Sequence, residues 1–536
     1  MTPPEAPALG RATTGMAIGT VLSRLTGFGR IAALAYALGF QRVTDTYNLA
    51  NTTPNIVYEL VIGGVLSGAI LVPFFVDRLA RRGDGDADEE EAWDAISAVV
   101  TVAAVALLAL TVLFTLLAPL VIRIYTFRLD GAAARDQEVV ATTLLRLFAP
   151  QVLFYGMVAV ATALLNARRR FVAPMVAPVL NNLVVIGMLV ALPHLVDDLS
   201  LAAVRHDTGA QLLLGLGTTA GVAAMALALL PSLRRAGLRL RVRWAPGHPA
   251  VRAILRRAGW VLGYVVANQV ALWTVLVLAN GRAGDVSAYQ AAFVFFLLPH
   301  GVVAVSIMTA LTPDLTERWS RRDQDGYRRQ LSFGLRATAV VLVPAAAGYV
   351  VLAHPIVSLL IERGALSAAS ADVTGDVLVL FALGLPAFSA YLLLMRGYYA
   401  MQDTRTPFVL NAAENGLNVV LALALYPALG VQGLALAYAL AYGAGAAVAA
   451  WDLHRRTAGI DGPAVLQSVA RVGAATAVMV VGVVGVVAVV GGDRGPALLA
   501  RVLVGVGAGV TLYLLAAKAL GVDELSAVTR LRRRTA

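Results

Sequence analysis

Long apolar stretches alternate with short polar segments along the whole chain. A membrane-spanning helix needs about 20 mainly apolar residues to cross a hydrocarbon core of about 30 Å. The pattern therefore predicts an all-α polytopic membrane protein with about 14 transmembrane helices. The predicted spans are residues 14–38, 46–76, 93–122, 139–166, 172–193, 209–232, 258–280, 286–315, 330–361, 373–400, 406–427, 430–451, 464–490 and 496–521.

The composition agrees with this class. Hydrophobic residues make up 59% of the 536 positions and charged residues 14%, well outside the range of ordinary soluble domains. Cysteine is absent, which excludes disulfides and thiolate metal sites. The only lysine, Lys518, follows "LAA" rather than a Walker A loop, so nucleotide-driven transport is excluded. We expect no bound cofactor, and energy from Na⁺, H⁺, the membrane potential or a substrate gradient.

Arginine is distributed unevenly between the two sets of alternating loops. One set, with both chain ends, carries 27 arginines and the other carries 8. Because cytoplasmic loops collect Lys and Arg, both termini are predicted to be cytoplasmic. This topology explains most of the net charge of +11, and we expect no nucleic-acid partner. The segment "LRLRVRW" (238–244) is basic enough to touch anionic lipid head groups, although the positive-inside rule alone accounts for it. The acidic run "GDGDADEEEAW" is predicted to be a solvated loop.

Two sequence echoes indicate an internal repeat. "PFFVDRLARRGD" from Pro73 and "PDLTERWSRRDQ" from Pro313 share the pattern P-x-x-x-[DE]-R-x-x-R-R, 240 residues apart, and "NARRRFVAP" and "AMQDTRTP" are offset by 233. These offsets correspond to six predicted spans. Because six is an even number, the two copies of the repeat have the same orientation in the membrane. The sequence thus predicts two six-helix lobes in a parallel repeat, residues 1–240 and 241–456, plus two extra C-terminal helices and a short basic tail within 457–536.

The first predicted span carries two charges, Arg24 and Arg30, inside "SRLTGFGRIAALAYALGF". Arg24 lies about 15 Å from the start of the span, and a central arginine costs at least about 2.5 kcal/mol on insertion scales. In one interpretation the arginines pair with Asp45 and Glu59 and lock the lobe. In the other they face a wet cavity and bind an anion, since the planar guanidinium suits phosphate. The "GFG" between them would then bend the helix and aim both at one cavity.

The second predicted span carries three asparagines on one helical face. Asn48, Asn51 and Asn55 lie at i, i+3 and i+7, and Pro54 frees backbone groups that need local partners. This stripe either lines water or forms interhelical hydrogen bonds. The candidate substrate-binding residues are Arg24, Arg30, Asp45, Asn48, Asn51, Asn55 and Glu59.

The eleventh predicted span places a carboxylate among amides. Asn411, Glu414, Asn415 and Asn418 lie at i, i+3, i+4 and i+7. Carboxylate and amide oxygens bind hard cations, and a membrane carboxylate can carry a proton. Asn268 is a candidate additional ligand. A site for Na⁺ or H⁺ and a purely structural polar seam both remain open.

Several stretches resemble the lipid II flippase family MurJ/MviN of the multidrug/oligosaccharidyl-lipid/polysaccharide exporter superfamily, closest to its high-GC Gram-positive branch. They include "SRLTGFGRIA", "TDTYNLANTTPNIVYELVIGGVLSGAILVPFF", "LNARRRFVAPMVAPVLNNLVVI" and "RGYYAMQDTRTPFVLNAAENGLNVV". The resemblance implies two lobes around a cationic cavity, with a groove for the lipid tail beside two extra C-terminal helices. Arg24, Arg30 and Asp45 match the family's cavity residues. Tyr58 and Val294 stand where many relatives have arginine.

The resemblance implies a non-enzymatic flippase for lipid II, the undecaprenyl-pyrophosphate-linked peptidoglycan precursor, moved from the inner to the outer leaflet by alternating access. The expected location is the bacterial plasma membrane, and the expected partners are lipid II, the bilayer and proteins of cell-wall synthesis. The alternatives are an exporter of another polyprenyl-linked glycan or of an amphipathic drug and, from another class, a membrane-embedded enzyme acting on polyprenyl pyrophosphates.

Overall fold

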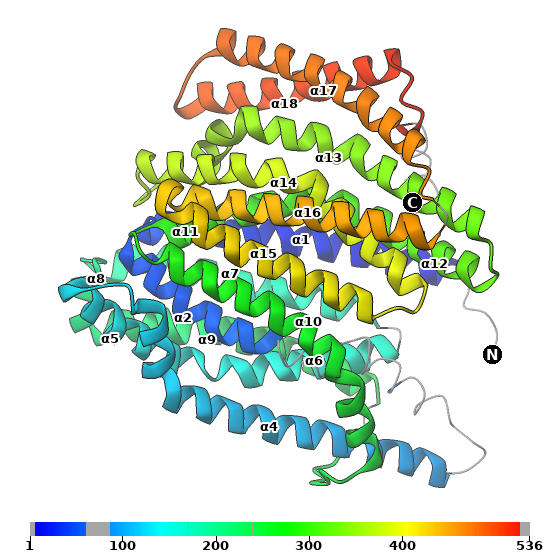
Figure 1. Ribbon diagram of the computed structural model, residues 1–536. Coiled ribbons are helices and arrows are strands. Elements are labelled where there is room, and N and C mark those ends of the chain that lie inside the picture. Colours follow the sequence, from blue (N-terminus) through cyan, green and yellow to red (C-terminus); the bar gives the residue numbers. More distant parts are fainter. Residues whose placement is uncertain are drawn as a thin grey trace. The chain divides into compact units, whose positions relative to one another are not determined.

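The computed structural model describes residues 6–59, 75, 86–168, 170–237, 240–457 and 459–525, and its elements are helices (Figure 1). The chain divides into two compact units, Met1–Gly284 and Asp285–Ala536. The helices of the first unit are α1 (Ala6–Leu38), α2 (Arg42–Tyr58), α4 (Asp86–Thr126), α5 (Gly131–Phe148), α6 (Gln151–Ala167), α7 (Val172–Leu195), α8 (Leu201–His206), α9 (Thr208–Arg235) and α10 (Pro249–Ala279).

The second unit contains eight α-helices and a π turn in its described residues. They are α11 (Asp285–Pro299), the π turn η2 (His300–Ala304), α12 (Val305–Ser320), α13 (Gln324–Ile361), α14 (Ala368–Ala400), α15 (Arg405–Leu429), α16 (Val431–Arg456), α17 (Gly462–Val490) and α18 (Gly495–Ala519).

Twelve segments of the described residues are long and apolar enough to cross a membrane. They confirm the predicted all-α polytopic class and match predicted spans three to fourteen. The first predicted span is helical as α1, and the second extends past the described end of α2. Of the two repeat copies, "PFFVDRLARRGD" lies outside the described residues except for Phe75, whereas the copy from Pro313 forms the end of α12 and the turn after it.

Two predicted spans are interrupted. The span 139–166 is divided into α5 and α6 at Ala149 and Pro150, because proline cannot donate the backbone hydrogen bond that would continue the helix. The span 286–315 contains the π turn at His300–Ala304. There His300 is buried and its Nδ1 lies 2.8 Å from Ser389 Oγ of α14.

In the first unit, α1 packs along α7 through its glycines. A Cβ at Gly27 would lie 3.6 Å from Asn182 of α7, and one at Gly29 would lie 3.4 Å from Ile186. Asn182 also donates a hydrogen bond to Thr26 Oγ1 at 3.0 Å. The "GFG" stretch remains within one continuous helix, so its glycines allow close helix packing rather than interrupt the helix.

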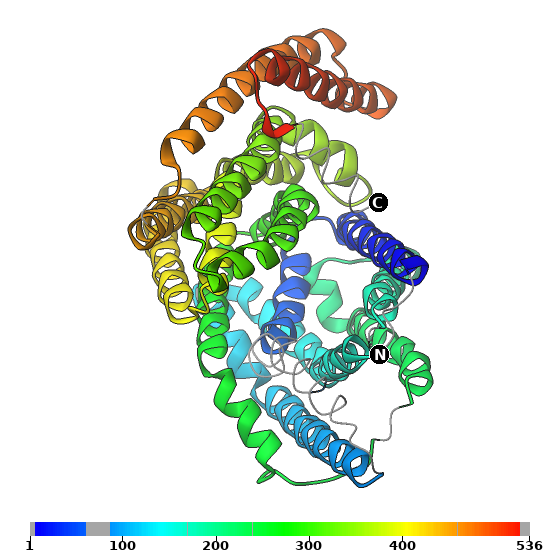
Figure 2. The same ribbon diagram turned by 90° about the vertical axis from the view of Figure 1, so that its right-hand side faces the viewer.

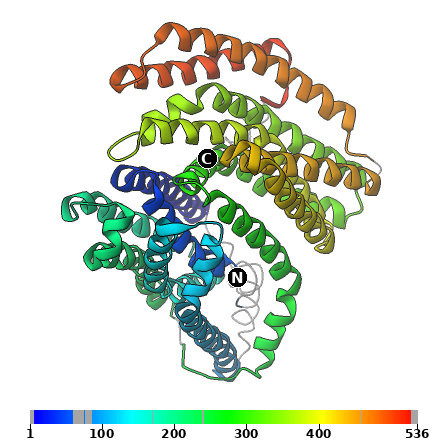
Figure 3. The ribbon, with the colours of Figure 1, turned by 60° about the vertical axis from the view of Figure 1, so that its left-hand side comes forward.

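The start of α10 belongs to the first unit by its contacts. Ala250, Val251 and Ile254 share an apolar core with Trp93 and Ile96 of α4. Figure 3 shows α10 beginning beside the first turns of α4. The unit boundary therefore follows Gly284, one helix later than the predicted lobe boundary at residue 240.

In the second unit, α14 lies between α13 and α16. Its Phe381 and Phe388 pack with Phe296 of α11 and with Tyr438 and Tyr442 of α16. The helices α17 and α18 pack on each other and against α13 (Figures 1 and 2). This pair corresponds to the two predicted extra C-terminal helices.

Candidate substrate and cation sites

The two arginines of α1 differ in exposure. Arg24 is exposed and Arg30 is partly buried. In the described part of the chain, neither side chain forms an ion pair with Asp45 or Glu59, the acids of the locking interpretation. Because α1 is continuous, residues six apart project about 120° apart around the axis and about 9 Å apart along it. The described contacts therefore do not include the predicted lock, and both the anion-binding role and a single cavity for the two arginines remain predictions.

Arg30 is close enough to Tyr155 of α6 to act on it electrostatically. Tyr155 packs against Tyr58 of α2, with ring centroids 4.6 Å apart. Tyr58 therefore belongs to the surroundings of Arg30. No motif marks Tyr155 in the sequence, and only the fold brings α6 to α2. Phenol hydroxyls beside a guanidinium can donate hydrogen bonds to phosphate or sugar oxygens.

The asparagine face of α2 is only partly engaged by protein. Asn48 is buried and has further contacts within the protein. Asn55 Nδ2 donates to the carbonyl of Asn51 at 3.0 Å, within the same helix. Asn51 Oδ1 is buried with no hydrogen-bond partner among the described residues. Since buried polar atoms are nearly always paired, this oxygen suits water or a substrate donor. Glu59, directly after α2, is exposed.

Asp45 lies in a polar junction. It is fully buried, and its Oδ2 accepts a hydrogen bond from the Gly284 backbone N–H at 2.6 Å. Gly284 has φ +91°, and a Cβ there would lie 2.6 Å from the carbonyl oxygen of Phe40. Nearby, Arg42 donates to the carbonyl of Asn280 at 2.6 Å. Asp45 thus ties the start of α2 to the end of the first unit, a contact that the sequence did not predict.

The polar face of α15 is buried as its spacing predicted. Asn411, Glu414, Asn415 and Asn418 are all at most 8% exposed. Asn415 Nδ2 donates to Glu414 Oε2 at 3.1 Å and to the Asn411 carbonyl at 2.9 Å. Glu414 Oε1 and Asn418 Oδ1 are buried and accept no hydrogen bond from the described residues. A buried carboxylate without a positive partner is costly, so this face suits a proton or a small cation.

Space for Glu414 comes from a glycine on α16. A Cβ at Gly445 would lie 3.2 Å from Glu414 Cγ and 3.3 Å from the ring of Tyr391 on α14. The carboxyl group therefore lies among α14, α15 and α16, against an aromatic ring. Asn268 lies on α10 in the first unit, where its Nδ2 donates to the Tyr264 carbonyl at 2.9 Å. Its predicted part in the cation site remains a prediction.

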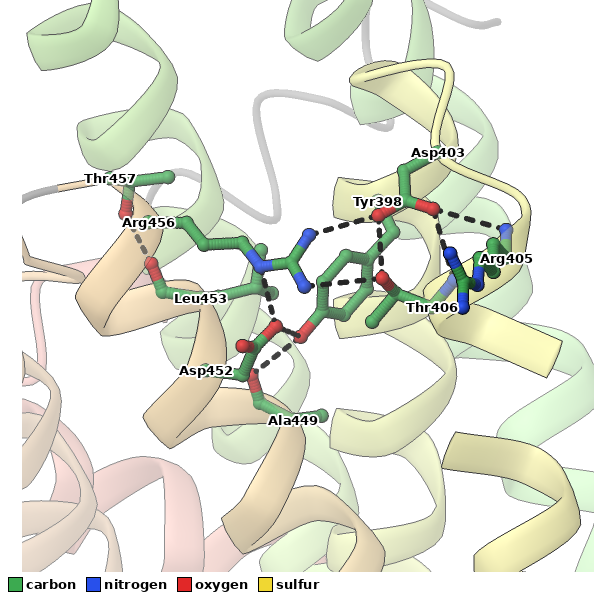
Figure 4. Close-up of polar contacts among 9 residues, drawn as sticks. All are labelled: Tyr398, Asp403, Arg405, Thr406, Ala449, Asp452, Leu453, Arg456 and Thr457. Carbon is green, nitrogen blue, oxygen red and sulfur yellow. Dashed lines mark hydrogen bonds and ion pairs between the residues drawn. The ribbon is translucent and has the colours of Figure 1, made fainter. Parts of the chain in front are cut away.

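A polar network fixes the start of α15 (Figure 4). Asp403 accepts hydrogen bonds from the Thr406 backbone N–H at 3.0 Å and hydroxyl at 2.6 Å, and Arg456 lies 2.9 Å from its Oδ2. Arg456 also pairs with Asp452, which accepts a hydrogen bond from Tyr398. Burial acts to raise the pKa of Asp403, but its bonds from Thr406 and Arg456 outweigh this and lower the pKa.

An apolar groove lies along the C-terminal helix pair. Its volume is about 410 Å³. Its walls come mainly from α13, α17 and α18, and include Val341, Leu352, Met479, Val483, Val506 and Leu514. Tyr513 closes part of the wall by donating a hydrogen bond to the Val340 carbonyl at 2.6 Å. The groove therefore offers an apolar chain a place outside the polar sites.

The family model described as lipid II flippase MurJ matches residues 34–505 of the chain. The chain belongs to this family. A probable lipid II flippase MurJ of Rhizobium meliloti strain 1021 is 30% identical, over 80% of this chain and 76% of that protein. One from Rhizobium tropici is 30% identical over 82% of each. A relative from Thermotoga maritima is 25% identical over 97% of this chain and 98% of its own.

Solved structures share the fold. One of a lipid II flippase MurJ in an inward closed conformation has a TM-score of 0.77, with 20% identity, and covers 95% of this chain and 99% of its own. An inward-facing multidrug MATE transporter of the MOP superfamily has a TM-score of 0.65, with 14% identity, and covers 81% of this chain and 94% of its own. The chain is a multi-pass protein of the bacterial plasma membrane.

Proposed function

We propose that the chain carries lipid II from the inner to the outer leaflet of the bacterial plasma membrane as a secondary transporter, by alternating access. The observation that carries this proposal is the membership of the flippase family together with Arg24 and Arg30, intramembrane cations without acid partners among the described residues. A pyrophosphate cannot enter hydrocarbon uncompensated, because burying its charge costs many kcal/mol. Guanidinium groups in a wet cavity replace its hydration.

The polyprenyl tail has a separate place in this proposal. The groove beside α17 and α18 is lined mostly by aliphatic side chains, so it offers a long apolar chain no polar partner and no charge. The tail enters this groove while the arginines hold the diphosphate. Asn51 Oδ1 and the phenols of Tyr58 and Tyr155 then serve the polar head group.

Two energy sources fit the residues. Export of negative charge across an inside-negative membrane gains about 2.3 kcal/mol per charge per 100 mV. Na⁺ or H⁺ binding at Glu414, with Asn411, Asn415 and Asn418 around it, would couple a second gradient to the transport cycle. The unpartnered Glu414 Oε1 supports this coupling.

The topology completes the proposal. Both termini are cytoplasmic because the arginine-rich loops lie on their side of the membrane. Proteins of cell-wall synthesis would receive the exported precursor in the outer leaflet and are the proposed partners.

Depletion of the protein in a cell without a redundant transporter tests the function. Lipid II should accumulate in the membrane while its fraction accessible to an externally added lipid II-degrading enzyme falls. Restored expression should reverse both changes. Accumulation with unchanged outer accessibility would contradict the proposal, because it would place the defect after transport.

A further inference from the structure

Residues 240–248, the described part of the connection between α9 and α10, run along α4 in the first unit without forming regular secondary structure (Figure 3). The Arg241 N–H donates to Ser97 Oγ at 3.1 Å, and the Arg243 N–H donates to Thr101 Oγ1 at 3.0 Å. The spacing matches geometrically, because two extended residues advance about 6.6 Å and four helical residues about 6 Å. The two backbone bonds therefore hold this segment in one register on α4.

The side chains of the same arginines add two ion pairs about two turns earlier on α4. Arg241 lies 3.2 Å from Glu90, and Arg243 pairs with Asp94. Glu90 belongs to the acidic run predicted as a solvated loop, which from Asp86 onward is helical. We call these four contacts, two backbone bonds and two ion pairs, the clasp.

The residues between and beside the two arginines are apolar and uncovered. Leu240 is 42% exposed, Val242 is 95% exposed and Trp244 is 60% exposed. Successive side chains of an extended strand point to opposite sides. The clasp therefore directs the arginines toward α4 and leaves an outward row of three apolar side chains.

The clasp lies level with the start of the continuous apolar part of α4. The 41 residues of α4 extend about 61 Å, twice the roughly 30 Å of a hydrocarbon core, so one end must project. Its polar first turns give way after Ser97 to the apolar run "AVVTVAAVALLAL". Val242, between the bonds to Ser97 and Thr101, is therefore level with the start of that run. Tryptophan is enriched at this interface.

Unpaired cations flank the row. Arg234 and Arg235 end α9, and Arg252 lies in the first turn of α10. All three are exposed, and none forms an ion pair with the described residues. Basic residues close to an anionic leaflet are attracted to its head groups, so apolar insertion and charge act together.

We propose that residues 240–244 form an interfacial anchor, which inserts Leu240, Val242 and Trp244 among anionic lipid head groups and is held at that depth by the clasp. The anchor fixes the segment just before α10 to both α4 and the lipid surface. It depends on the membrane location of the family and is independent of the identity of the transported lipid.

The natural absence of cysteine makes the depth of this segment directly measurable. The full chain carrying Val242→Cys is labelled with an environment-sensitive fluorophore and reconstituted in phosphatidylcholine vesicles with or without phosphatidylglycerol. A nitroxide on the lipid head group should quench this label at least threefold more than it quenches a label at Asp493→Cys, an exposed position in the α17–α18 turn. Aqueous iodide should show the reverse preference, and phosphatidylglycerol should increase the nitroxide effect.

Two results would overturn the anchor. Iodide quenching at Val242→Cys equal to that at Asp493→Cys would place the segment in water. Protection from both quenchers would mean that protein covers it.

The clasp is tested by adding Glu90→Gln and Asp94→Asn to the labelled chain, which should lower nitroxide quenching at least twofold with an unchanged elution volume of the purified protein. Unchanged quenching would show that the ion pairs do not set the depth. Because the readout needs no lipid II, its failure leaves the transport proposal intact.

Discussion

The polar helix faces of the two units differ in sign and in exposure. In the first unit, α1 presents Arg24, exposed, and Arg30, partly buried, with no acid partner in the described residues. In the second unit, α15 buries one acid, Glu414, among three asparagines. Among the described residues, neither face is neutralised as a structural ion pair would be. In the proposed function, this difference corresponds to an anion site on the first unit and a small-cation site on the second.

Removal of the cationic face should have the largest effect. Each charge-assisted hydrogen bond is worth about 1.5–3 kcal/mol, so Arg24→Ala with Arg30→Ala should lower lipid II transport in proteoliposomes by at least roughly 100-fold. Lysine at both positions should restore only part of the activity, because it lacks the bidentate geometry.

The matched control for this pair is Arg146→Ala on α5, an exposed arginine of another membrane helix, which should retain near-normal transport. Full transport by the double alanine variant would remove the distinction between the two faces. It would show that lipid II transport does not depend on these two arginines.

The acidic face should respond more selectively. Glu414→Gln keeps the size of the side chain and removes its charge, so any stabilisation of the purified protein by Na⁺ should vanish and ion-stimulated transport should fall about tenfold. Asp376→Asn, at an exposed carboxylate of α14, is the control and should keep the ion response. If the coupling ion is H⁺, wild-type transport should depend on the pH gradient and ignore Na⁺, and the Gln variant should lose that dependence. If the response to the ion is unchanged in Glu414→Gln, the polar face of α15 serves only to hold neighbouring helices together.

A substitution in the apolar groove should have a smaller effect on transport, and it should depend on the length of the lipid tail. Val483→Trp fills the space between α17 and α18, and overpacking costs about 1–3 kcal/mol. Transport of lipid II should fall several-fold, while a short-chain analogue with the same head group should be affected less. Val481→Trp points away from the groove, being 74% exposed, and serves as the control. Equal loss for both chain lengths would argue against tail binding there.

Substitution in the polar network at the start of α15 should have the smallest effect, and only on stability. The pKa of Asp403 is lowered in the folded protein, so its stabilisation is fully present above its ordinary value of 3.8 and disappears as the pH falls through the lowered value. Asp403→Asn should lower the free energy of unfolding by at most about 1 kcal/mol at pH 6, because water screens the partly exposed pair with Arg456. The difference in stability between the variant and the wild type, measured by thermal unfolding in detergent, should disappear below the ordinary pKa. A stability difference that does not change with pH would show that the ion pair is not its cause.

The sequence predicted the features that depend on helical spacing. The burial of Asn411, Glu414, Asn415 and Asn418 on one face follows directly from a period of 3.6 residues, as does the succession of spans. Contacts between distant segments were not predictable in this way. The clasp joins residues about 150 positions apart, and Asp45 meets Gly284 across 239 positions. Local pattern carries no information about such pairs, so the anchor and the polar junction required the fold.

The central claim is that the α1 arginines lie in water and accept a diphosphate. The cysteine-free chain allows a direct test with Arg24→Cys, which leaves Arg30 in place. A charged, water-soluble thiol reagent should modify this cysteine rapidly in the reconstituted protein, and saturating lipid II should slow the modification several-fold while a neutral polyprenol should not. Modification that occurs only after denaturation, or at a rate indifferent to lipid II, would contradict the account.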